Sequence, residues 1–184
     1  MNDDARLARL ADRAEIQDLG VLYGFIMDEF DEAGVRATFC EDAELHSADG
    51  VFNARGIDEI LSTYRGRWAS LDTSNHFPHG HVVRFDEREP DRAYGLLSGH
   101  AEVVRSGQAF HVALRYKDEY RRDGSRWKFA DRLMSYMYYL PASERDEHLG
   151  DRDSVWVYGD PQPADWPEVR FSGASSEFLS RFYR

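Results

Sequence analysis

The chain has 184 residues, of which 42% are hydrophobic and 14% aromatic, and this composition predicts one globular domain with a tail. Its net charge of −11 argues against a nucleic-acid partner and against an anionic membrane surface, because both require clustered lysine and arginine. The single cysteine, Cys40, excludes an intrachain disulfide and a cysteine-based zinc site. The acidic N-terminus and the absence of a long apolar run predict a cytoplasmic protein that does not enter a membrane.

The first predicted element is a long amphipathic helix that ends near Asp28. Apolar residues recur at three-to-four spacing from Leu7 and Leu10 to Met27, which is the pattern of a helix with one buried face. Gly34 is expected to break the chain before a short second helix at about 35–39. A carboxylate at the C-terminal end of a helix opposes the helix dipole, so we expect Asp28 to have a compensating partner elsewhere.

The β-rich half of the chain is predicted to follow these helices. Short strands are expected at 44–46 and 50–52, and a further helix at 56–68. From residue 76 onward the apolar period changes to two, which predicts strands at about 76–86, 92–105, 109–122 and 126–140. Short turn signals join these strands, so they are expected to form antiparallel hairpins. Helices followed by a long meander indicate an α+β fold, with the helices on one face of a curved sheet.

The last part of the chain has a different composition. After Pro141 the residues Asp, Glu, Pro and Gly occur at loop density, yet aromatic residues from Trp156 to Tyr183 are scattered among them. A disordered tail seldom carries so many aromatic residues. We therefore predict a pocket domain at 1–141 and a C-terminal arm at 142–184 that packs on the pocket or on a neighbouring subunit.

His76 is the leading candidate for chemistry. An imidazole that a carboxylate holds near neutral pH is a general base. The structural alternative is a strand histidine bonded to the backbone, and for a single residue that alternative is the more frequent outcome. The nearby His79 and His81 raise the further alternative of a metal site, but no local spacing supplies the other ligands, and no metal is predicted.

Tyr23 and Asp28 are five residues apart on the first predicted helix. Five residues correspond to about 140° around a helix axis, so the two side chains are expected to flank a cavity from different angles. The structural alternatives are a core tyrosine and a solvated helix end.

Two strand positions are ambiguous. Arg132 alternates with Met134 and Tyr136, and this row is either a pocket lining with one polar group or a subunit interface. His100 alternates with polar neighbours, as the residues of a solvated outer face or of a polar cavity lining do.

Two stretches of the chain resemble the SnoaL-like branch of the nuclear-transport-factor-2-like superfamily. They are RLARLADRAEIQDL at 6–19 and YKDEYRRDG at 116–124, the latter followed by WKF at 127–129. The resemblance covers about residues 5–140. It implies a cone-shaped α+β barrel, in which a strongly curved mixed or antiparallel sheet wraps an apolar pocket and N-terminal helices close it. This fold hosts many reactions, so the resemblance is more specific for fold than for chemistry.

Members of this family include scytalone dehydratase, bile acid 7α-dehydratase, hexachlorocyclohexane dehydrochlorinase, ketosteroid isomerase and polyketide cyclases. The spacing of Asp28, His76 and Arg132 is similar to that of the dyad and leaving-group arginine of the dehydrochlorinase. Tyr23 stands where that enzyme has a lysine and where the bile acid dehydratase has a tyrosine, which favours loss of water over loss of chloride. His100 falls near another polar catalytic group of the dehydratases.

The resemblance thus implies a cofactor-independent lyase that removes water from a small, apolar, cyclic alcohol. Its expected catalytic residues are Asp28, His76, Tyr23, Arg132 and His100, with His76 as the base. The alternatives are a ketosteroid-type isomerase, a polyketide-cyclase-like enzyme, and a non-catalytic ligand-binding or assembly subunit. Because family members are dimers or trimers, a homodimer or homotrimer is expected.

Overall fold

The structure, a computed structural model, describes residues 3–166 and 177–183. The helices of these residues are α1 (Asp3–Asp28), α2 (Glu32–Thr38), α3 (Ile57–Trp68), α4 (Arg145–His148) and α6 (Glu177–Ser180). The strands are β1 (Phe39–Ser47), β2 (Asn53–Arg55), β3 (Thr73–Phe85), β4 (Arg92–Arg105), β5 (Gln108–Asp123) and β6 (Arg126–Pro141). The strands form one sheet in the order β2-β1-β6-β5-β4-β3.

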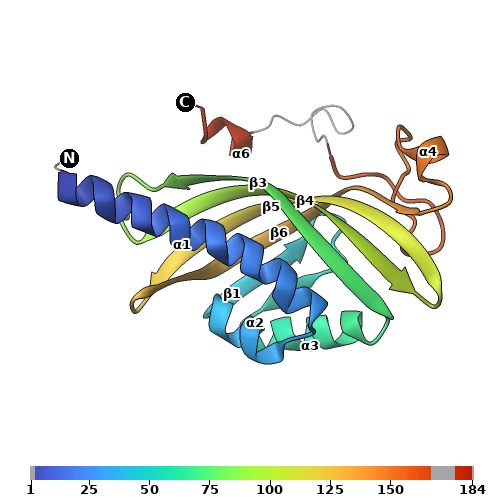
Figure 1. The fold of residues 1–184 in the computed structure, drawn as a ribbon, viewed down its shortest axis with the longest axis horizontal. Coiled ribbons are helices and arrows are strands. Elements are labelled where there is room, and N and C mark those ends of the chain that lie inside the picture. The colour runs from blue at the N-terminus through green and yellow to red at the C-terminus, as the bar shows by residue number, and fades with distance from the viewer. Residues whose placement is uncertain (1–2, 167–176, 184) are drawn as a thin grey trace.

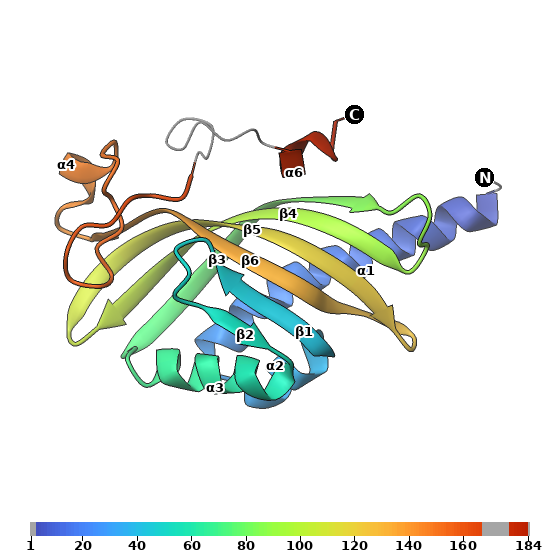
Figure 2. The ribbon, with the colours of Figure 1, turned by 180° about the vertical axis from the view of Figure 1, so that it is seen from behind.

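The sheet is mixed and strongly curved. Strands β3 to β6 pair antiparallel in succession, as the short turn signals predicted, whereas β1 pairs parallel with β6. Gly107 and Gly124 occupy the turns of two hairpins with φ of 77° and 61°, a conformation that glycine adopts without steric cost. The helices α1, α2 and α3 lie together under the arch of the sheet (Figures 1 and 2). The predicted α+β fold with helices on one face is confirmed.

Aromatic side chains form the centre of the core between the helices and the sheet. Four rings are buried here and each contacts at least two of the others: Tyr23 of α1, Phe39 of β1, Tyr64 of α3 and Phe129 of β6. The separations of their ring centroids range from 5.0 to 6.5 Å, which is the range of favourable aromatic pairs. Residues from four elements therefore meet at the place where the candidate site lies.

Three local predictions were wrong. Gly34 lies inside α2, and the chain turns instead at Phe30, which has a φ of 54°. Residues 50–52 lie in a turn, and the short strand β2 follows them. The predicted buried stripe of α1 began too early, because Leu7 and Leu10 are 64% and 61% exposed, and burial begins at Ile16.

The described part of the C-terminal arm packs on its own sheet. Val155 pairs with Tyr139 in a parallel bridge, the backbone N–H of Asp165 donates to the carbonyl of Tyr136 at 2.8 Å, and Trp166 is buried. Residues 167–176 of the arm lie outside the described residues. The division at 141 and a contact of the arm with a neighbouring subunit stay predictions.

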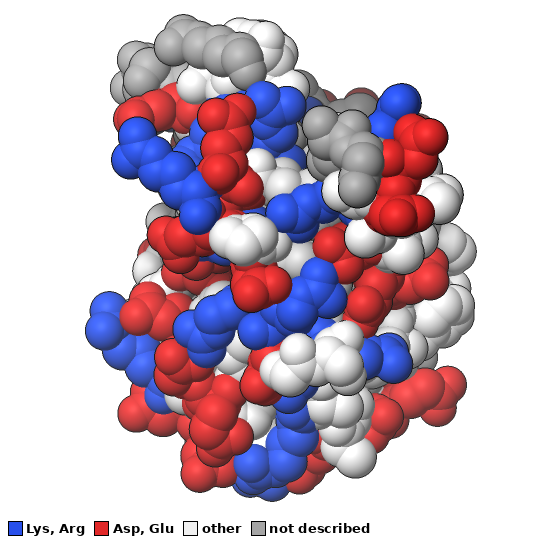
Figure 3. Space-filling view, turned by 90° about the vertical axis from the view of Figure 1, so that its left-hand side faces the viewer, with Lys and Arg blue, Asp and Glu red and all other residues white. Residues whose placement is uncertain are grey.

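Charges of both signs are interleaved on the end of the molecule that holds the N-terminus (Figure 3). Arg122 contacts both Asp12 and Asp91, at 2.5 and 3.0 Å, and Arg92 contacts Glu119 at 2.6 Å. This face therefore has no continuous basic stripe of the kind that binds phosphate backbones. Among the described helices, none has both the length and the apolar character needed to cross a bilayer.

Candidate active site

A contact between Asp28 and His76 forms the centre of the candidate site. Asp28 is the last residue of α1, and His76 lies on β3, the strand that runs beside this helix. The Nδ1 of His76 lies 2.6 Å from Oδ1 of Asp28, and the His76 backbone N–H donates to Oδ2 at 2.8 Å. The hydroxyl of Ser74 donates to Oδ1 at 2.9 Å. The compensating partners expected for Asp28 are therefore His76 and Ser74.

These contacts select one tautomer of His76. A carboxylate only accepts hydrogen bonds, so Nδ1 carries a proton, and in the neutral ring Nε2 then presents the lone pair. Burial tends to raise the pKa of Asp28, but the hydrogen bonds from His76 and Ser74 outweigh it and hold this pKa below its ordinary value. Asp28 is therefore ionised at neutral pH. Within the described ranges, Nε2 makes no hydrogen bond, and the ring borders a cavity.

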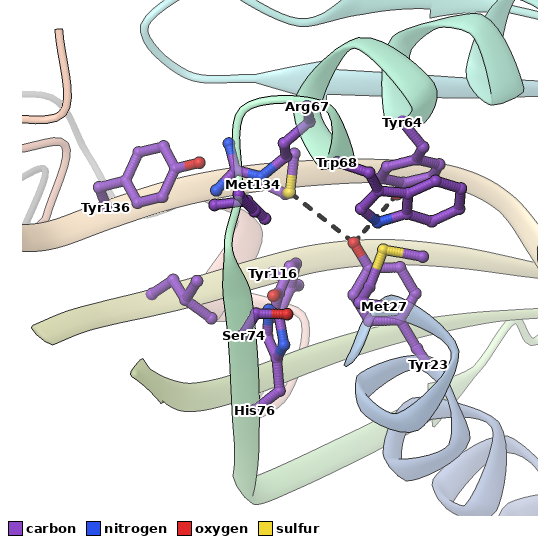
Figure 4. A pocket seen from close by; sticks show the side chains of 12 residues that line it. Tyr23, Met27, Tyr64, Arg67, Trp68, Ser74, His76, Tyr116, Met134 and Tyr136 are labelled. Carbon is purple, nitrogen blue, oxygen red and sulfur yellow. Dashed lines mark hydrogen bonds between the residues drawn. The ribbon is translucent and has the colours of Figure 1, made fainter. Parts of the chain in front are cut away.

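The cavity beside His76 is small and mostly apolar. Its volume of about 20 Å³ is enough for about one water molecule. Its walls come from α1, α3 and the strands β3, β5 and β6 (Figure 4). They comprise Tyr23, Met27, Tyr64, Arg67, Trp68, Leu71, Ser74, His76, Leu114, Tyr116, Met134 and Tyr136. A second space of about 10 Å³ shares four of these residues, Tyr23 and His76 among them, so Tyr23 and His76 are brought to the same place.

Tyr23 presents a protonated hydroxyl to this place. Its hydroxyl lies 3.0 Å from that of Tyr64 and 4.0 Å from Sδ of Met134 (Figure 4). Burial raises the pKa of both tyrosines, so both keep their protons at neutral pH. A buried hydroxyl that retains its proton is able to donate a hydrogen bond or a proton to a group in the cavity.

Arg132 lies behind this wall and does not line either cavity. It is fully buried, with Nε 3.2 Å from Oδ1 of Asp118. Its guanidinium carbon lies 3.9, 4.0 and 4.3 Å from the ring centroids of Tyr23, Tyr116 and Phe129. Burial raises the pKa of Asp118 to about 6, against the opposing effect of Arg132. Arg132 is thus a buried cation that contacts the rings of Tyr23 and Tyr116, and these two rings separate it from the cavity.

Within the described residues, His100 makes no hydrogen bond with Asp28 or His76, although it lines the smaller cavity together with His76 and Tyr23. Its side chain is exposed at the edge of the smaller cavity, and its Nδ1 lies 2.6 Å from Nε2 of His79. His81 instead points into the core, where its Nε2 lies 3.1 Å from the hydroxyl of Tyr120. The three histidines of β3 therefore have separate surroundings. In the part of the chain that the structure describes, the one group of three side chains close enough to hold a metal comprises Glu44, His46 and Asp131.

The sequence interpretation missed three residues of the site. Ser74 precedes His76 by two positions on a strand and so shares its face. Arg67 follows Tyr64 by three positions on α3, which places both on one side of that helix. Tyr64, at the centre of the buried stripe of α3, was expected only as a helix residue. The two-residue spacing of Ser74 from His76 and the three-residue spacing of Arg67 from Tyr64 were the sequence signals that could have identified these residues.

Comparison with known proteins places this architecture in a family. The SnoaL-like domain family matches residues 8–133. The gamma-hexachlorocyclohexane dehydrochlorinase of Sphingobium indicum is 29% identical over 148 residues, a match that covers 73% of this chain and 86% of that protein. A crystal structure of a hexachlorocyclohexane dehydrochlorinase (LinA) is similar with a TM-score of 0.69 at 24% identity, over 74% of this chain and 92% of that one.

A putative scytalone dehydratase from Novosphingobium aromaticivorans is similar in fold. Its TM-score is 0.66 at 19% identity, over 72% of this chain and 89% of that one. The family match alone spans more than half of the chain, and the structure has the curved sheet and covering helices expected of the fold. This protein therefore belongs to the SnoaL-like domain family.

Proposed function

We propose that this protein is a cofactor-independent lyase that removes water from a small organic substrate, with His76 as the general base. The observation that carries the proposal is the 2.6 Å contact between Asp28 and Nδ1 of His76. This contact keeps the lone pair of Nε2 available at the cavity. The similarity to dehydrochlorinases supports elimination as the class of reaction.

In the proposed reaction, Nε2 of His76 takes a proton from a carbon of the substrate. The electron pair of that C–H bond forms a carbon–carbon double bond, and the neighbouring C–O bond breaks. Tyr23 gives its proton to the departing hydroxyl, which leaves as water. The hydroxyl of Tyr64, 3.0 Å away, then stabilises the phenolate. The proton on His76 returns to Tyr23 through solvent, so the enzyme regains its starting state.

Arg132 has a positioning role in this scheme. Burial raises the pKa of Tyr23, and the positive charge of Arg132 acts against that rise. The guanidinium therefore stabilises the phenolate that forms when Tyr23 gives up its proton. His100 has no contact with the reacting groups in this scheme, because its side chain is exposed and pairs with His79.

The cavity favours a small, largely apolar substrate such as a cyclic alcohol with an acidified C–H bond. The aromatic walls supply apolar contact area, and a few polar groups fix orientation, as is usual for ligand sites. Met27 and Met134 line the cavity, and methionine side chains adapt easily to new shapes. Their movement is expected to widen the cavity when a substrate enters.

The experiment that tests this proposal uses a panel of cyclic hydroxy ketones and hydroxy acids. Mass spectrometry should detect a product lighter than its substrate by one water molecule. The His76→Gln variant should lower kcat by about 10²–10⁴-fold, the range for a general base. His79→Gln, which changes an exposed histidine of the same strand, is the matched control and should retain kcat.

The other outcomes separate the rival functions. A product of unchanged mass that requires His76 indicates an isomerase, and release of chloride from hexachlorocyclohexane indicates a dehydrochlorinase. Ligand binding with no turnover of any compound favours a pocket protein without catalysis. Equal turnover by the His76→Gln variant and the unmodified protein refutes His76 as the base.

A further inference from the structure

Arg67 brings a positive charge into the cavity that the proposed reaction has not used. It enters from α3, while His76 enters from β3, and both line the same space (Figure 4). Among residues 3–166 and 177–183, its guanidinium forms no ion pair and no hydrogen bond; its one aromatic contact is with the ring of Phe52, at 5.3 Å. Arginine remains charged at every accessible pH. The cavity therefore contains a cation without a counter-ion from the described chain.

The acidic residues around α3 have other partners. Glu32 contacts Arg65 at 2.5 Å, and Asp58 contacts Arg36 at 2.8 Å. These ion pairs lie on the exposed face of the helix, whereas Arg67 points to the opposite, cavity-lining side. A partly buried cation with no counter-charge is unfavourable unless another group offsets its desolvation. Arg65, two positions before Arg67, therefore has an ion-pair partner, whereas Arg67 has none within the described residues.

Tyr136 adds a second donor beside Arg67. Its side chain is 1% exposed and lines the same cavity. Its hydroxyl points toward the guanidinium in Figure 4. This hydroxyl makes no hydrogen bond within the described residues; the backbone N–H of Tyr136 is used by Asp165. Two donors, one of them charged, are therefore directed at one place.

We propose that Arg67 and Tyr136 form an oxyanion subsite for the substrate. A planar guanidinium fork matches a carboxylate or enolate oxygen, and the tyrosine hydroxyl adds a third donor. The inference rests on the proposed function, because it takes the cavity beside His76 as the substrate site. It narrows the substrate to a compound whose reacting C–H bond is next to a carbonyl-type carbon, such as a β-hydroxy ketone or a β-hydroxy acid.

The subsite also explains how proton removal from carbon proceeds without a cofactor. When His76 removes the proton, negative charge moves to the oxygen of the adjacent carbonyl group. A fixed cation at that oxygen stabilises the charge as it develops, in a site from which water is largely excluded. The oxygen retains this charge only until the C–O bond breaks, when the electron pair forms the double bond and hydroxide leaves with the proton of Tyr23.

Binding of inert probes tests the subsite without a substrate. Benzoate carries a carboxylate, 4-nitrophenolate carries an enolate-like oxygen, and benzamide is the neutral counterpart of benzoate. Calorimetry should show at least one of the two anions bound more tightly than benzamide. The Arg67→Gln variant should weaken that anion about 10- to 100-fold and leave benzamide unchanged, as loss of a charge-assisted hydrogen bond does. Tyr136→Phe should weaken it by a smaller factor.

Arg65→Gln is the matched control, because it removes the same charge from the exposed face of the same helix. It should leave anion affinity unchanged. Arg67→Lys keeps the charge and loses the fork, so it should retain part of the preference and serves as the second variant where Arg67→Gln fails to fold. Preference for benzoate identifies a carboxylate in the substrate, and preference for 4-nitrophenolate identifies an enolate.

Two results overturn the inference. One is equal affinity for the anions in the unmodified protein and the folded Arg67 variants, and the other is an equal loss in Arg65→Gln, which indicates a general charge effect. The His76→Gln variant should bind the probes normally. Its behaviour therefore distinguishes a failure of the subsite from a failure of the proposed base.

Discussion

Replacement of Asp28 by asparagine tests the contact on which the proposed reaction depends. The carboxylate of Asp28 accepts hydrogen bonds from the His76 ring, the His76 backbone and Ser74 at 2.6, 2.8 and 2.9 Å. An amide has only one oxygen, which remains suited to the backbone N–H. Its NH₂ group then faces Nδ1 of His76, and two donors do not bond. The imidazole must therefore move its proton to Nε2, which removes the lone pair from the cavity.

The expected loss is much larger for catalysis than for stability. In the serine-protease triad the equivalent aspartate-to-asparagine change fixes the wrong histidine tautomer and lowers kcat by about 10⁴-fold. We expect a decrease of about 10³–10⁴-fold here, because the base is held in the same way. The hydrogen bonds lose their charge but keep their partners, so the free energy of unfolding should fall by only about 1–3 kcal/mol.

Nitrogen NMR of the histidine ring reports the tautomer directly, alongside steady-state kcat. The unmodified protein should show His76 protonated at Nδ1, and Asp28→Asn should show it protonated at Nε2. Asp31→Asn removes the same charge from an exposed residue of the next turn and should change neither quantity. A folded Asp28→Asn variant that keeps the Nδ1 proton and a kcat within about threefold refutes the reasoning.

Two further predictions concern the core beside the site. Burial, together with the charge of Arg132, lowers the pKa of His81 from 6.5 to about 4. The folded state therefore favours the neutral ring, and this contribution to stability is fully present only at a pH above the unfolded-state pKa of His81. That contribution, about 3 kcal/mol, should be lost as the pH falls from 6.5 toward 4; urea unfolding should show the loss in the unmodified protein and not in His81→Gln. Gly95→Ala would place a methyl group 2.6 Å from Tyr120 and 2.9 Å from His81, and should lower the free energy of unfolding by about 1–3 kcal/mol. Gly66→Ala, where nothing lies within 4 Å, should raise it by about 0.5–1 kcal/mol, and equal melting temperatures for the two variants would contradict this.

Long elements of the fold were predictable because their periodic signal repeats many times. The strand predicted at 92–105 is β4, and the first long helix ends at Asp28 as expected. The three-residue strand β2 is too short for alternation to reveal it. Gly34 was misinterpreted as a helix breaker because a close tertiary contact, and not a break in the helix, requires glycine at this position. A Cβ at that position would lie 2.7 Å from Ile26 and from Asp31, so glycine is there to let α2 approach α1.

The proximity of Asp28 to His76 was predictable only from their joint spacing in a known family. Neither residue has a local pattern that distinguishes it from a solvated helix end or a strand histidine. The position of His100 follows from simple alternation, since the odd-numbered residues of β4 from Ala93 to Val103 face the core. Its outward direction was therefore within reach of the sequence. The catalytic roles of these residues stay predictions that the variants above test.

Alternation left the direction of Arg132 and Tyr136 open between a pocket lining and a subunit interface, because β6 does not alternate regularly. Its pairing with β5 skips one residue between Phe129 and Asp131 and another between Tyr136 and Tyr138. Each bulge reverses which side chains face the core. Phe129 faces inward, strict alternation from it would turn Arg132 and Tyr136 outward, and the first bulge turns both inward. That one extra residue places the guanidinium of Arg132 against the ring of Tyr23 and turns the side chain of Tyr136 into the cavity that Arg67 also lines. The positions of both side chains therefore depend on an irregularity that periodicity does not encode.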